Sequence, residues 1–553
     1  MKSVKKTGTP LKWIFRSIKK QVPVIVFIVI LNSILACCST VGAIISKYII
    51  DNAINRNHEM FILFGVLFVA NFAFNIVFNA VSNYITERCK ATIEMNMKAN
   101  LFESITRKQY DEVSKYHSGT LLNRLTSDVS IIVGCVTSVF PNFFALIIKL
   151  AFAFSVVVSY EPWFALVFGV GGIVVFFGTK LLRKQMKKLH KNVQAEDDKV
   201  RSFWQESLSN LLAVKVFSNE GNMAEKSNKL QQKLFKAKMK KAKFNVFTGA
   251  GYHSGMVLGY IFAFLWCSTK LLYKVSGFTY GTFTSIMQLV GQVQQPFSSI
   301  SGIIPQYYNA IASAERIMEV EDIDDEVNEI PDFDIKSVYD SMKSIKINNL
   351  TFSYKKESHV FENVNFEINK GDFAAIVGHS GIGKSTLFKI MLGVYTPQGG
   401  SIDIVCDDKT YQCSCATRKL FSFVPQGNLI FSGSIKDNVT FVNDDVSDEQ
   451  VEEVLRLSCA NEFVDKLPEG IDTIIGEKGL GLSEGQVQRI AIARALLSDA
   501  PVILLDEATS ALDAVTEAKV LENLMQLKTK TCIIVTHRKQ ALKVCNKKWE
   551  IKE

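Results

Sequence analysis

The sequence contains no grouping of cysteines and histidines at the spacing of a metal site. Its 11 cysteines are odd in number and scattered along 553 residues, and the C-x-C pair of Cys413 and Cys415 has no partner pair. Zinc sites and disulfide frameworks are recognised by such regular spacings. We therefore interpret the cysteines as ordinary reduced thiols.

Acidic residues are absent from residues 1–20, which are rich in lysine and arginine. A basic tail ahead of an apolar segment is typical of a signal peptide, and residues 34–37 resemble a lipoprotein cleavage box. The apolar segment, however, extends over about residues 22–50, which is longer than the core of a signal peptide, and further apolar segments follow. We expect residues 1–20 to form a cytoplasmic basic segment, with an interfacial helix over residues 9–19.

Apolar residues are abundant, because 48% of the chain is hydrophobic and it contains 39 phenylalanines. The excess lies almost wholly in about the first 300 residues, so we expect a membrane half followed by a soluble half. A net charge of +9 suits a nucleic-acid partner, but the lysines and arginines flank hydrophobic segments. Membrane topology and lipid headgroups explain them better. We expect contact with membrane lipids and no nucleic-acid partner.

Six segments are apolar over about 20 residues, the length that a helix needs to cross a membrane. Most segments between them are short and lightly charged, whereas residues 87–130 and 180–243 are long and dense in lysine and arginine. The positive-inside rule places these two in the cytoplasm. We predict a six-helix transmembrane domain over residues 21–318. Its spans are expected near residues 22–50, 60–85, 133–159, 164–182, 247–272 and 281–303.

The two long inner segments carry helical patterns. We interpret them as cytoplasmic extensions of the second to fifth spans, which turn around near residues 116–119 and 209–212. Extensions that stand this far from the bilayer would reach a soluble domain. The alternative is a plain solvated helical hairpin.

Lys149 lies inside the third predicted span, where an ionisable group is costly and marks a functional site by default. The alternative is a snorkelling side chain whose ammonium reaches a leaflet surface. The fifth span contains His253, and the sixth carries glutamines beside Pro296, a position that favours a kink. These glutamines either line a polar cavity or hydrogen-bond neighbouring helices. They are Gln288, Gln292, Gln294 and Gln295.

Residues 319–344 are acidic, contain proline and lack apolar periodicity, so we interpret them as a linker. Over residues 345–553, short strands alternate with helices, which predicts a layered α/β domain. Within it, GHSGIGKST fits the pattern G-x-x-x-x-G-K-[ST] between an apolar strand and a helix. The residues of this stretch are Gly378, His379, Ser380, Gly381, Ile382, Gly383, Lys384, Ser385 and Thr386.

This stretch predicts an ATP site in a P-loop ATPase domain. A glycine-rich turn lets several backbone N–H groups converge on an anion at the positive end of a helix. Lys384 can then reach the β- and γ-phosphates, and the Ser385 hydroxyl can ligate Mg²⁺. A chance glycine turn is the alternative, but strand, turn, Lys-Ser pair and helix coincide.

Two other apolar strands end in residues that suit ATP hydrolysis. The strand over residues 501–505 leads into Asp506, which is placed to hold the Mg²⁺ shell, and Glu507, which can orient or deprotonate the attacking water. The strand over residues 532–536 delivers His537 to the same edge of the sheet. A lone histidine is more often structural, but its place beside the two acids favours a role in the site.

With these residues the chain resembles an ATP-binding cassette (ABC) transporter of the exporter type, a half-transporter whose membrane domain precedes its nucleotide-binding domain. The resemblance covers essentially the whole chain, and its specificity lies in the second half. Further motifs follow in the family's order. They are Tyr354 for the adenine-stacking aromatic, Gln426 for the Q-loop, residues 473–477 for an exporter-specific stretch, Leu482-Ser483-Glu484-Gly485-Gln486 for the signature, Asp513 for the D-loop and His537 for the switch histidine.

The resemblance implies ATP and Mg²⁺ as cofactors, and two chains that clamp two ATP molecules between them. Ser483 and Gly485 of one chain would face the γ-phosphate bound by the other. Gln426 would sense that phosphate and link it to the cytoplasmic extensions. The implied catalytic residues are Glu507, His537, Gln426 and Lys384; the implied nucleotide contacts add Tyr354, Ser483, Gly485, Gln486 and Asp513 to the phosphate-binding stretch; and the implied metal ligands are Ser385, Gln426 and Asp506.

The sequence departs from the family pattern in three places. Glu484 replaces the first glycine of the usual pair, but the serine and the next glycine remain, so we expect a working site. The chain ends soon after His537 without the usual final strand and helix, which leaves the edge of the domain in question. Only a short basic segment precedes the first span, so we expect no N-terminal cysteine peptidase of the kind found in some peptide exporters.

We therefore expect a multi-pass plasma-membrane ATPase that works as a homodimer and exports an amphipathic or hydrophobic drug or peptide, with its nucleotide-binding domain in the cytoplasm. A lipid flippase and one half of a heterodimeric exporter are the alternatives within transport. A soluble ABC-type ATPase acting on ribosomes or DNA conflicts with six spans, and a ligand-gated channel would need a selectivity filter. Aromatic-rich spans suit drugs, lipids and apolar peptides alike, so the substrate stays open.

Overall fold

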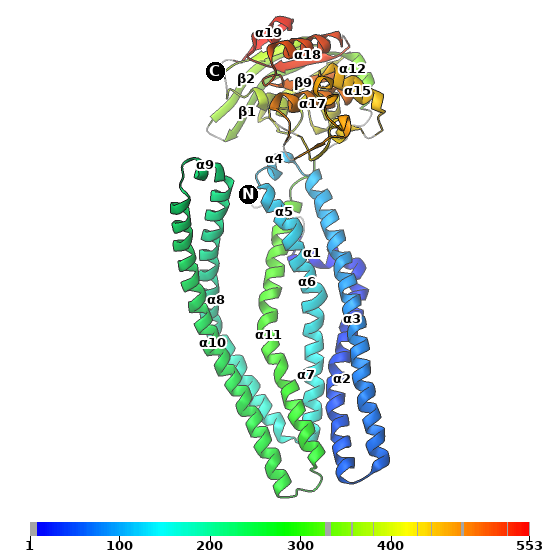
Figure 1. Ribbon diagram of the computed structural model, residues 1–553, viewed down its shortest axis with the longest axis vertical. Coiled ribbons are helices and arrows are strands. Elements are labelled where there is room, and N and C mark those ends of the chain that lie inside the picture. Colours follow the sequence, from blue (N-terminus) through cyan, green and yellow to red (C-terminus); the bar gives the residue numbers. More distant parts are fainter. Residues whose placement is uncertain are drawn as a thin grey trace. The chain divides into compact units, whose positions relative to one another are not determined.

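The computed structural model describes residues 8–326, 333–355, 358–379, 381–427, 430–443, 445–476, 481–527 and 529–551. It divides into two compact units, which Figure 1 shows as a set of long helices and a mixed α/β body. The helical unit comprises Met1–Phe102 and Gly119–Asp322, and the α/β unit comprises Glu103–Ser118 and Ile323–Glu553. A helical domain followed by an α/β domain confirms the predicted fold class.

Within the described residues, the helical unit has six long helices, and each predicted span lies inside one of them. One of the six is a rod from Ser118 to Tyr160 in which α5, α6 and α7 follow one another through two π-helical turns. The six are α2 (Val22–Ile54), α3 (His58–Arg107), the rod of α5 (Ser118–Asn123), α6 (Val129–Gly134) and α7 (Phe140–Tyr160), α8 (Trp163–Ser209), α10 (Glu220–Leu272) and α11 (Tyr280–Glu321).

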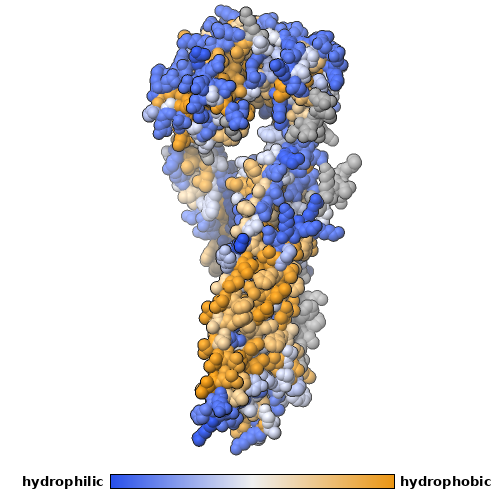
Figure 2. All heavy atoms as spheres, turned by 90° about the vertical axis from the view of Figure 1, so that its right-hand side faces the viewer, coloured by the Kyte–Doolittle hydropathy of each residue, from blue (hydrophilic) through white to orange (hydrophobic). Residues whose placement is uncertain are grey.

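Among the described residues, four helical stretches are long and apolar enough to cross a membrane. Figure 2 shows the resulting apolar belt on the face that carries α2 and α3, with polar residues beyond each end of the belt. Many side chains of α8 between residues 165 and 183 lie outside the described residues. The four stretches are Lys19–Ile54, His58–Arg107, Ser118–Tyr160 and Glu220–Leu272.

Three helices are much longer than a membrane span requires. α3, α8 and α10 contain 50, 47 and 53 residues, whereas a span takes about 20. The extensions predicted from the sequence are therefore present, and they reverse direction over residues 108–117 and 210–219, at or next to the predicted turns. The first reversal carries α4 (Tyr110–Val113) and the second carries α9 (Leu211–Val216).

An ion pair with a buried carboxylate joins the rod to α11. Asp128 is 1% exposed, and its carboxylate accepts a hydrogen bond from the Ser313 hydroxyl at 2.9 Å and pairs with the Arg316 guanidinium. A buried carboxylate is tolerated only when it is paired and hydrogen-bonded. This cluster therefore fixes the register between the two helices.

A helix, α1 (Pro10–Ser17), is present within the segment predicted to form an interfacial helix. It buries Trp13 and Ile14 and exposes the basic residue Arg16. The Trp13 indole N–H donates to the Glu321 carboxylate at 2.6 Å, which ties α1 to the last turn of α11.

The α/β unit contains an antiparallel sheet of order β2-β1-β4-β5 and a parallel sheet of order β11-β3-β10-β9-β6. Parallel strands place their carboxyl ends along one edge, where ligands of such sheets bind. The antiparallel strands are β1 (Met342–Lys355), β2 (Ser358–Asn369), β4 (Gly399–Cys406) and β5 (Thr410–Gln412); the parallel strands are β3 (Phe373–Val377), β6 (Phe421–Val424), β9 (Val502–Asp506), β10 (Thr531–Val535) and β11 (Lys547–Glu550); the longer helices are α13 (Lys384–Met391), α15 (Asp448–Leu457), α17 (Glu484–Leu497) and α18 (Ala514–Gln526).

The central parallel strands are buried on both faces. Every residue of β9 and β10 is buried, which explains their continuous apolar runs. Alternate side chains enter two cores: Ile503 and Leu505 pack in the core that includes α15, α17 and α18, whereas Leu504 and Ile533 pack in the core that includes β1, β4 and α13. The tips of these strands are therefore held rigidly.

Residues 319–344, which the sequence predicts to be a linker, contain regular structure. Helix α11 continues into this segment and ends at Glu321, and a further helix, α12, spans Ile335–Ser341. Tyr339 of α12 is buried, and its hydroxyl donates a hydrogen bond to the Thr529 carbonyl at 2.8 Å. The segment next to β1 is therefore packed into the α/β unit.

The expectation that no final strand follows His537 is wrong. A short helix, α19 (Lys539–Val544), leads to β11, which pairs in parallel with β3. Trp549 of β11 stacks on Phe366 with ring centroids 4.5 Å apart. Charged residues are typical of an edge strand, and they concealed β11 in the sequence.

Candidate active site

The phosphate loop joins β3 to α13, and two of its glycines are required by geometry. Gly381 and Gly383 have φ of +87° and +106°, which L-residues rarely adopt. A Cβ at Gly383 would lie 2.4 Å from the Val360 side chain and 3.0 Å from the Phe361 ring. Because α13 begins at Lys384, its unpaired N–H groups lie at the end of this loop. Ser380, also predicted in the site, lies outside the described residues.

Lys384 is buried within the loop, with 6% of its surface exposed. Its ammonium donates to the carbonyl oxygens of Gly378 at 2.7 Å and His379 at 2.9 Å, and lies 3.0 Å from the His537 Nε2 atom. Burial lowers the pKa of Lys384, and two nearby carboxylates oppose this shift. An anionic ligand in the loop would supply the counter-charge that this ammonium needs.

Asp506, at the end of β9, is 3% exposed, and among the described residues its Oδ1 atom accepts no hydrogen bond. Burial raises the pKa of Asp506, and a hydrogen bond from Ser385 acts in the opposite direction. A buried carboxylate oxygen without a donor is costly, and a divalent cation would relieve that cost. These two oxygen ligands suit Mg²⁺, which is commonly held by few protein groups together with phosphate oxygens.

The described part of the chain contains no group of three or more histidine, cysteine or acidic residues able to hold a metal ion. All 11 cysteines lie in that part, and no disulfide joins any of them.

Glu507 is turned toward the site by an unusual backbone conformation. Its φ is +49°, a region that few residues other than glycine occupy, and its N–H donates to the Val535 carbonyl at 3.0 Å. Its carboxylate accepts a hydrogen bond from the Gln426 amide at 2.8 Å and lies 3.9 Å from the His537 Nε2 atom. The structure thus brings together three predicted residues from the tips of β6, β9 and β10, in an arrangement that suits activation of a water molecule.

Tyr354, the predicted base-stacking residue, lies on β1 beside the start of α13. Its hydroxyl is 2.8 Å from the Thr386 hydroxyl, and the side chain of Tyr395 meets its ring edge-on at 5.4 Å. The Tyr354 side chain is exposed. An exposed ring held in this way can stack on a nucleotide base.

The signature residues form the start of α17. The Ser483 hydroxyl accepts from the Gln486 N–H at 3.3 Å, and the Gln486 side chain accepts from the Ser483 N–H at 2.8 Å, which is a capping box. A Cβ at Gly485 would lie 2.8 Å from the Ala511 carbonyl oxygen, whereas Glu484 is exposed. Within the described residues, no hydrogen bond or ion pair joins this signature to the phosphate loop.

Asp513, the predicted D-loop residue, is exposed and caps α18. Its carboxylate accepts from the N–H groups of Val515 and Thr516, both at 3.1 Å. Hydrogen bonds from Thr516 are the main reason that the pKa of Asp513 is lowered. The carboxylate is therefore an anion at the beginning of a helix.

Sequence reasoning missed the buried network that holds the segment between Glu507 and Asp513. Glu517 is 2% exposed; it accepts from the Thr509 hydroxyl at 2.9 Å and from the Arg538 guanidinium at 3.0 Å. Arg538 also donates to the Leu512 carbonyl at 2.7 Å. Arg538 directly follows the histidine singled out in the sequence, but nothing in the sequence marked Glu517.

Gln488, which closely follows the signature in the sequence, connects the signature helix to the same segment, a contact that the sequence did not predict. Its side-chain amide donates to the Ser510 hydroxyl at 3.1 Å, and its carbonyl accepts from the Ala511 N–H at 3.0 Å. Gln488 is 6% exposed, so it is a structural link between two predicted motifs.

Both halves of the chain match models of known protein families. The family model described as "ABC transporter transmembrane region" matches residues 25–297, and the model described as "ABC transporter" matches residues 361–510. The "ATP-dependent lipid A-core flippase" of Desulfotalea psychrophila is 31% identical over 473 residues, which cover 83% of this chain and 80% of that protein. The chain belongs to the ABC transporter family.

This ABC transporter has its membrane region before its ATPase region, which is the order of an exporter-type half-transporter. The "Probable ABC transporter ATP-binding/permease protein" of Haemophilus influenzae is 27% identical and covers 81% of each chain. The solved structure described as "a bacterial Atm1-family ABC exporter with ATP bound" shares the fold, with a TM-score of 0.79, 21% identity, and coverage of 97% of this chain and 94% of that one. The chain is thus an ATPase that couples hydrolysis to transport.

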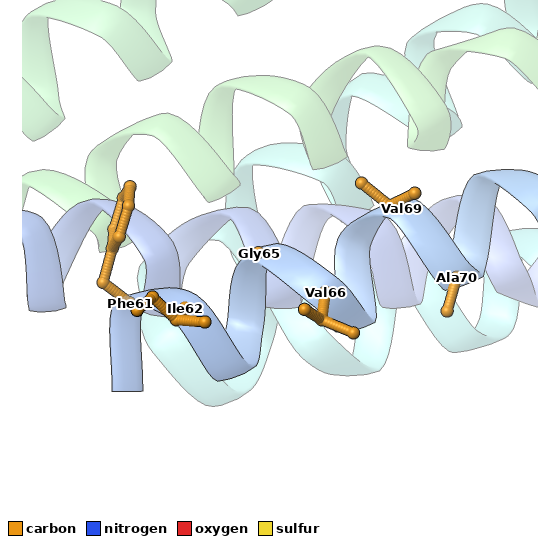
Figure 3. Close-up of a pocket in the computed structure, with 6 residues that line it drawn as sticks. All are labelled: Phe61, Ile62, Gly65, Val66, Val69 and Ala70. Carbon is orange, nitrogen blue, oxygen red and sulfur yellow. The ribbon is translucent and has the colours of Figure 1, made fainter. Parts of the chain in front are cut away.

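The ABC transporter also has a shallow apolar hollow on α3, which is unrelated to the nucleotide site. Figure 3 shows that its lining comes from neighbouring turns of one helix. None of these side chains can donate a hydrogen bond to a ligand. Its lining residues are Phe61, Ile62, Gly65, Val66, Val69 and Ala70.

Proposed function

We propose that two copies of this chain form an ATP-driven exporter that moves an amphipathic or hydrophobic drug or peptide outward across the plasma membrane. The α/β units lie in the cytoplasm. The observation that carries this proposal is the gathering of Lys384, Gln426, Glu507 and His537 around one phosphate loop, to which no hydrogen bond or ion pair among the described residues joins the signature. Each chain then supplies half of two ATP sites, and its partner supplies the other half.

The residues around the phosphate loop have separate roles in ATP hydrolysis. Lys384 and the N–H groups at the start of α13 hold the β- and γ-phosphates. Glu507 accepts a proton from the attacking water, and its hydrogen bond to Gln426 fixes the carboxylate. His537 holds the γ-phosphate. Ser483 and Gly485 of the partner copy complete the site, and Tyr354 stacks on the adenine.

Mg²⁺ would be held by Asp506, Ser385 and Gln426. The buried Asp506 oxygen that has no donor among the described residues supports this assignment. When bound, the ion neutralises charge on the phosphate oxygens.

ATP binding favours the closed pair of α/β units because each ATP contacts both copies, and hydrolysis removes those contacts. The reversal between α3 and α5 supports a route to the membrane helices, because Glu103–Ser118 packs with the α/β unit. Lys108 pairs with Asp325 at 2.7 Å, and the Gln109 N–H donates to the Asp324 carbonyl at 3.0 Å. We assign residues 21–318 to the transmembrane domain and residues 345–553 to the nucleotide-binding domain.

A lipid flippase is the second candidate. It is favoured by the relatives from Desulfotalea psychrophila and Syntrophus aciditrophicus, both named "ATP-dependent lipid A-core flippase". A homodimer is favoured over a heterodimer because Glu507 and His537 are both present, so this chain carries no crippled site.

Reconstitution tests the function directly. Purified protein in vesicles should move fluorescent drugs, apolar peptides or labelled lipids only when ATP is present, and the Glu507→Gln variant should move none. Movement of labelled lipid alone would select the flippase. ATP hydrolysis by the wild type without movement of any probe would refute the export proposal.

A further inference from the structure

Lys149 lies near the middle of the third predicted span. At about 1.5 Å of rise per residue, it is about 16 Å along α7 from Tyr160, the last residue of the helix. Half of an apolar membrane core about 30 Å thick is about 15 Å. Four methylene groups cannot carry the ammonium over that distance to a headgroup layer. Snorkelling, the alternative that the sequence left open, therefore does not account for this residue.

The chain offers no counter-charge for Lys149 inside the membrane. None of the six predicted spans contains aspartate or glutamate. A second copy has the same sequence and adds none. Other lysines near the span ends are accommodated: Lys270 pairs with Glu161 at 3.3 Å, and the Lys47 ammonium lies 4.3 Å from the centroid of the Tyr160 ring.

Lys149 instead contacts a neutral amide. Its ammonium donates to the Gln295 Oε1 atom at 2.7 Å, which is its only hydrogen bond among the described residues. This contact joins α7 to α11, two helices that pack on each other. An ammonium that lies in the membrane core with only an amide partner keeps most of its desolvation cost, so an anion bound beside it would be strongly favoured.

Gln295 differs from the other three glutamines of the sixth predicted span. Gln292 accepts from the hydroxyls of Ser39 and Thr40 at 3.2 and 2.8 Å, and Gln294 donates to the Met256 carbonyl at 3.0 Å. Gln288 donates to the Ser46 hydroxyl at 3.3 Å. These three amides bind neighbouring helices, one of the two roles expected for them. The Gln295 Nε2 group donates to no atom among the described residues, so it keeps hydrogens for a ligand.

We propose that Lys149 and Gln295 bind the anionic group, a phosphate or a carboxylate, of the transported amphipath. This inference rests on the proposed export function and specifies the charge of its substrate. The ammonium supplies the charge, the Gln295 amide supplies a second donor, and the apolar helices contact the hydrocarbon body. Charge-assisted hydrogen bonds of this kind are strongest where water is excluded.

The test uses the full-length protein in phosphatidylcholine nanodiscs and three probes with the same chain: dodecyl phosphate, dodecyl trimethylammonium and dodecyl maltoside. Dodecyl phosphate should stimulate ATP hydrolysis at the lowest concentration. In Lys149→Gln that concentration should rise about tenfold or more, because a charge-assisted contact is lost. Lys149→Arg should stay within about threefold of wild type, and the control Lys47→Gln should be unchanged.

A second variant covers the case in which Lys149→Gln folds poorly. Gln295→Glu is nearly isosteric and places a carboxylate beside the ammonium, so it should remove the preference for dodecyl phosphate by occupying the site. Replacing the nanodisc lipid by phosphatidylglycerol distinguishes the source of the anion. Stimulation without added probe would identify a lipid headgroup, whereas dependence on added dodecyl phosphate would identify a separate amphipath.

The outcomes separate the two proposals. Equal stimulation by all three probes, or an unchanged response of Lys149→Gln and Gln295→Glu, would overturn the anion site and leave the export function standing. Failure of every amphipath to stimulate hydrolysis would overturn both.

Discussion

The α/β unit and the helical unit use polar residues in opposite ways. In the α/β unit they concentrate at the tips of parallel strands, where Glu507 meets Gln426 and His537 lies against Lys384. In the predicted spans of the helical unit they are mostly single amides spread along helices, and the Gln292 amide, for example, hydrogen-bonds one neighbouring turn of α2. Hydrolysis needs fixed groups at fixed distances, whereas a path for an amphipath needs an apolar surface with few polar contacts. Sequence motifs therefore identify the ATPase unit but do not identify the transported substrate.

The largest effect should come from the carboxylate at the tip of β9. Glu507→Gln should lower the rate of ATP hydrolysis by about 10²–10⁴, because the amide cannot accept the proton of water. Nucleotide affinity should stay near that of wild type. Steady-state hydrolysis and equilibrium binding measure the two, with the exposed Glu522→Gln on α18 as control. Near-normal turnover would show that Glu507 does not accept the proton of the attacking water.

The next effect should come from the phosphate loop. Lys384→Ala removes an ammonium whose pKa is lowered by burial and whose counter-charge would be the nucleotide phosphates. ATP affinity should fall about tenfold to hundredfold, since a charge-assisted contact is lost. Equilibrium titration with ATP measures this, and the exposed Lys409→Ala is the matched control. An unchanged affinity would show that Lys384 only braces the loop carbonyls.

A smaller effect should come from the network that the sequence did not reveal. Arg538→Ala leaves the buried Glu517 carboxylate without its cation and should destabilise the α/β unit by about 2–3 kcal/mol, since Arg538 is partly exposed. Its thermal transition should move several degrees lower. The Arg538→Met, Glu517→Leu double variant should recover much of the loss, because no unpaired charge remains. A double variant as unstable as the single one would contradict the ion-pair explanation.

The smallest effect should come from the helical unit. Gln292→Leu removes hydrogen bonds between α11 and α2, but such contacts within membranes contribute only about 0.6 kcal/mol. Hydrolysis should stay within about twofold of wild type and the thermal transition should barely move. A loss as large as that of Arg538→Ala would break the comparison between the two units.

The same comparison explains what the sequence could predict. The phosphate loop, Asp506 and Glu507 were identified because each follows a buried strand at a spacing that the chemistry requires. Glu517 escaped notice because it sits in an ordinary helix and acquires its role only through contact with Thr509 and Arg538. The edge strand β11 escaped because charged residues mask its alternation. Lys149 was noticed for its cost in a membrane, but only the structure revealed its partner, Gln295.

The central claim is that each ATP lies between the phosphate loop of one copy and the signature of its partner. Lys384→Ala disables the first half of a site, and Ser483→Arg disables the second by placing a bulky side chain at the cap of α17. Two differently tagged chains permit purification of mixed pairs in which the two changes lie on separate chains or together on one.

Hydrolysis by these mixed pairs tests the claim most directly. With the changes on separate chains, one complete site remains, so hydrolysis should exceed the Glu507→Gln background. With both changes on one chain, both sites are damaged and hydrolysis should fall to that background. The reverse result, activity only when both changes share a chain, would show that each chain hydrolyses ATP alone and would contradict the two-copy mechanism.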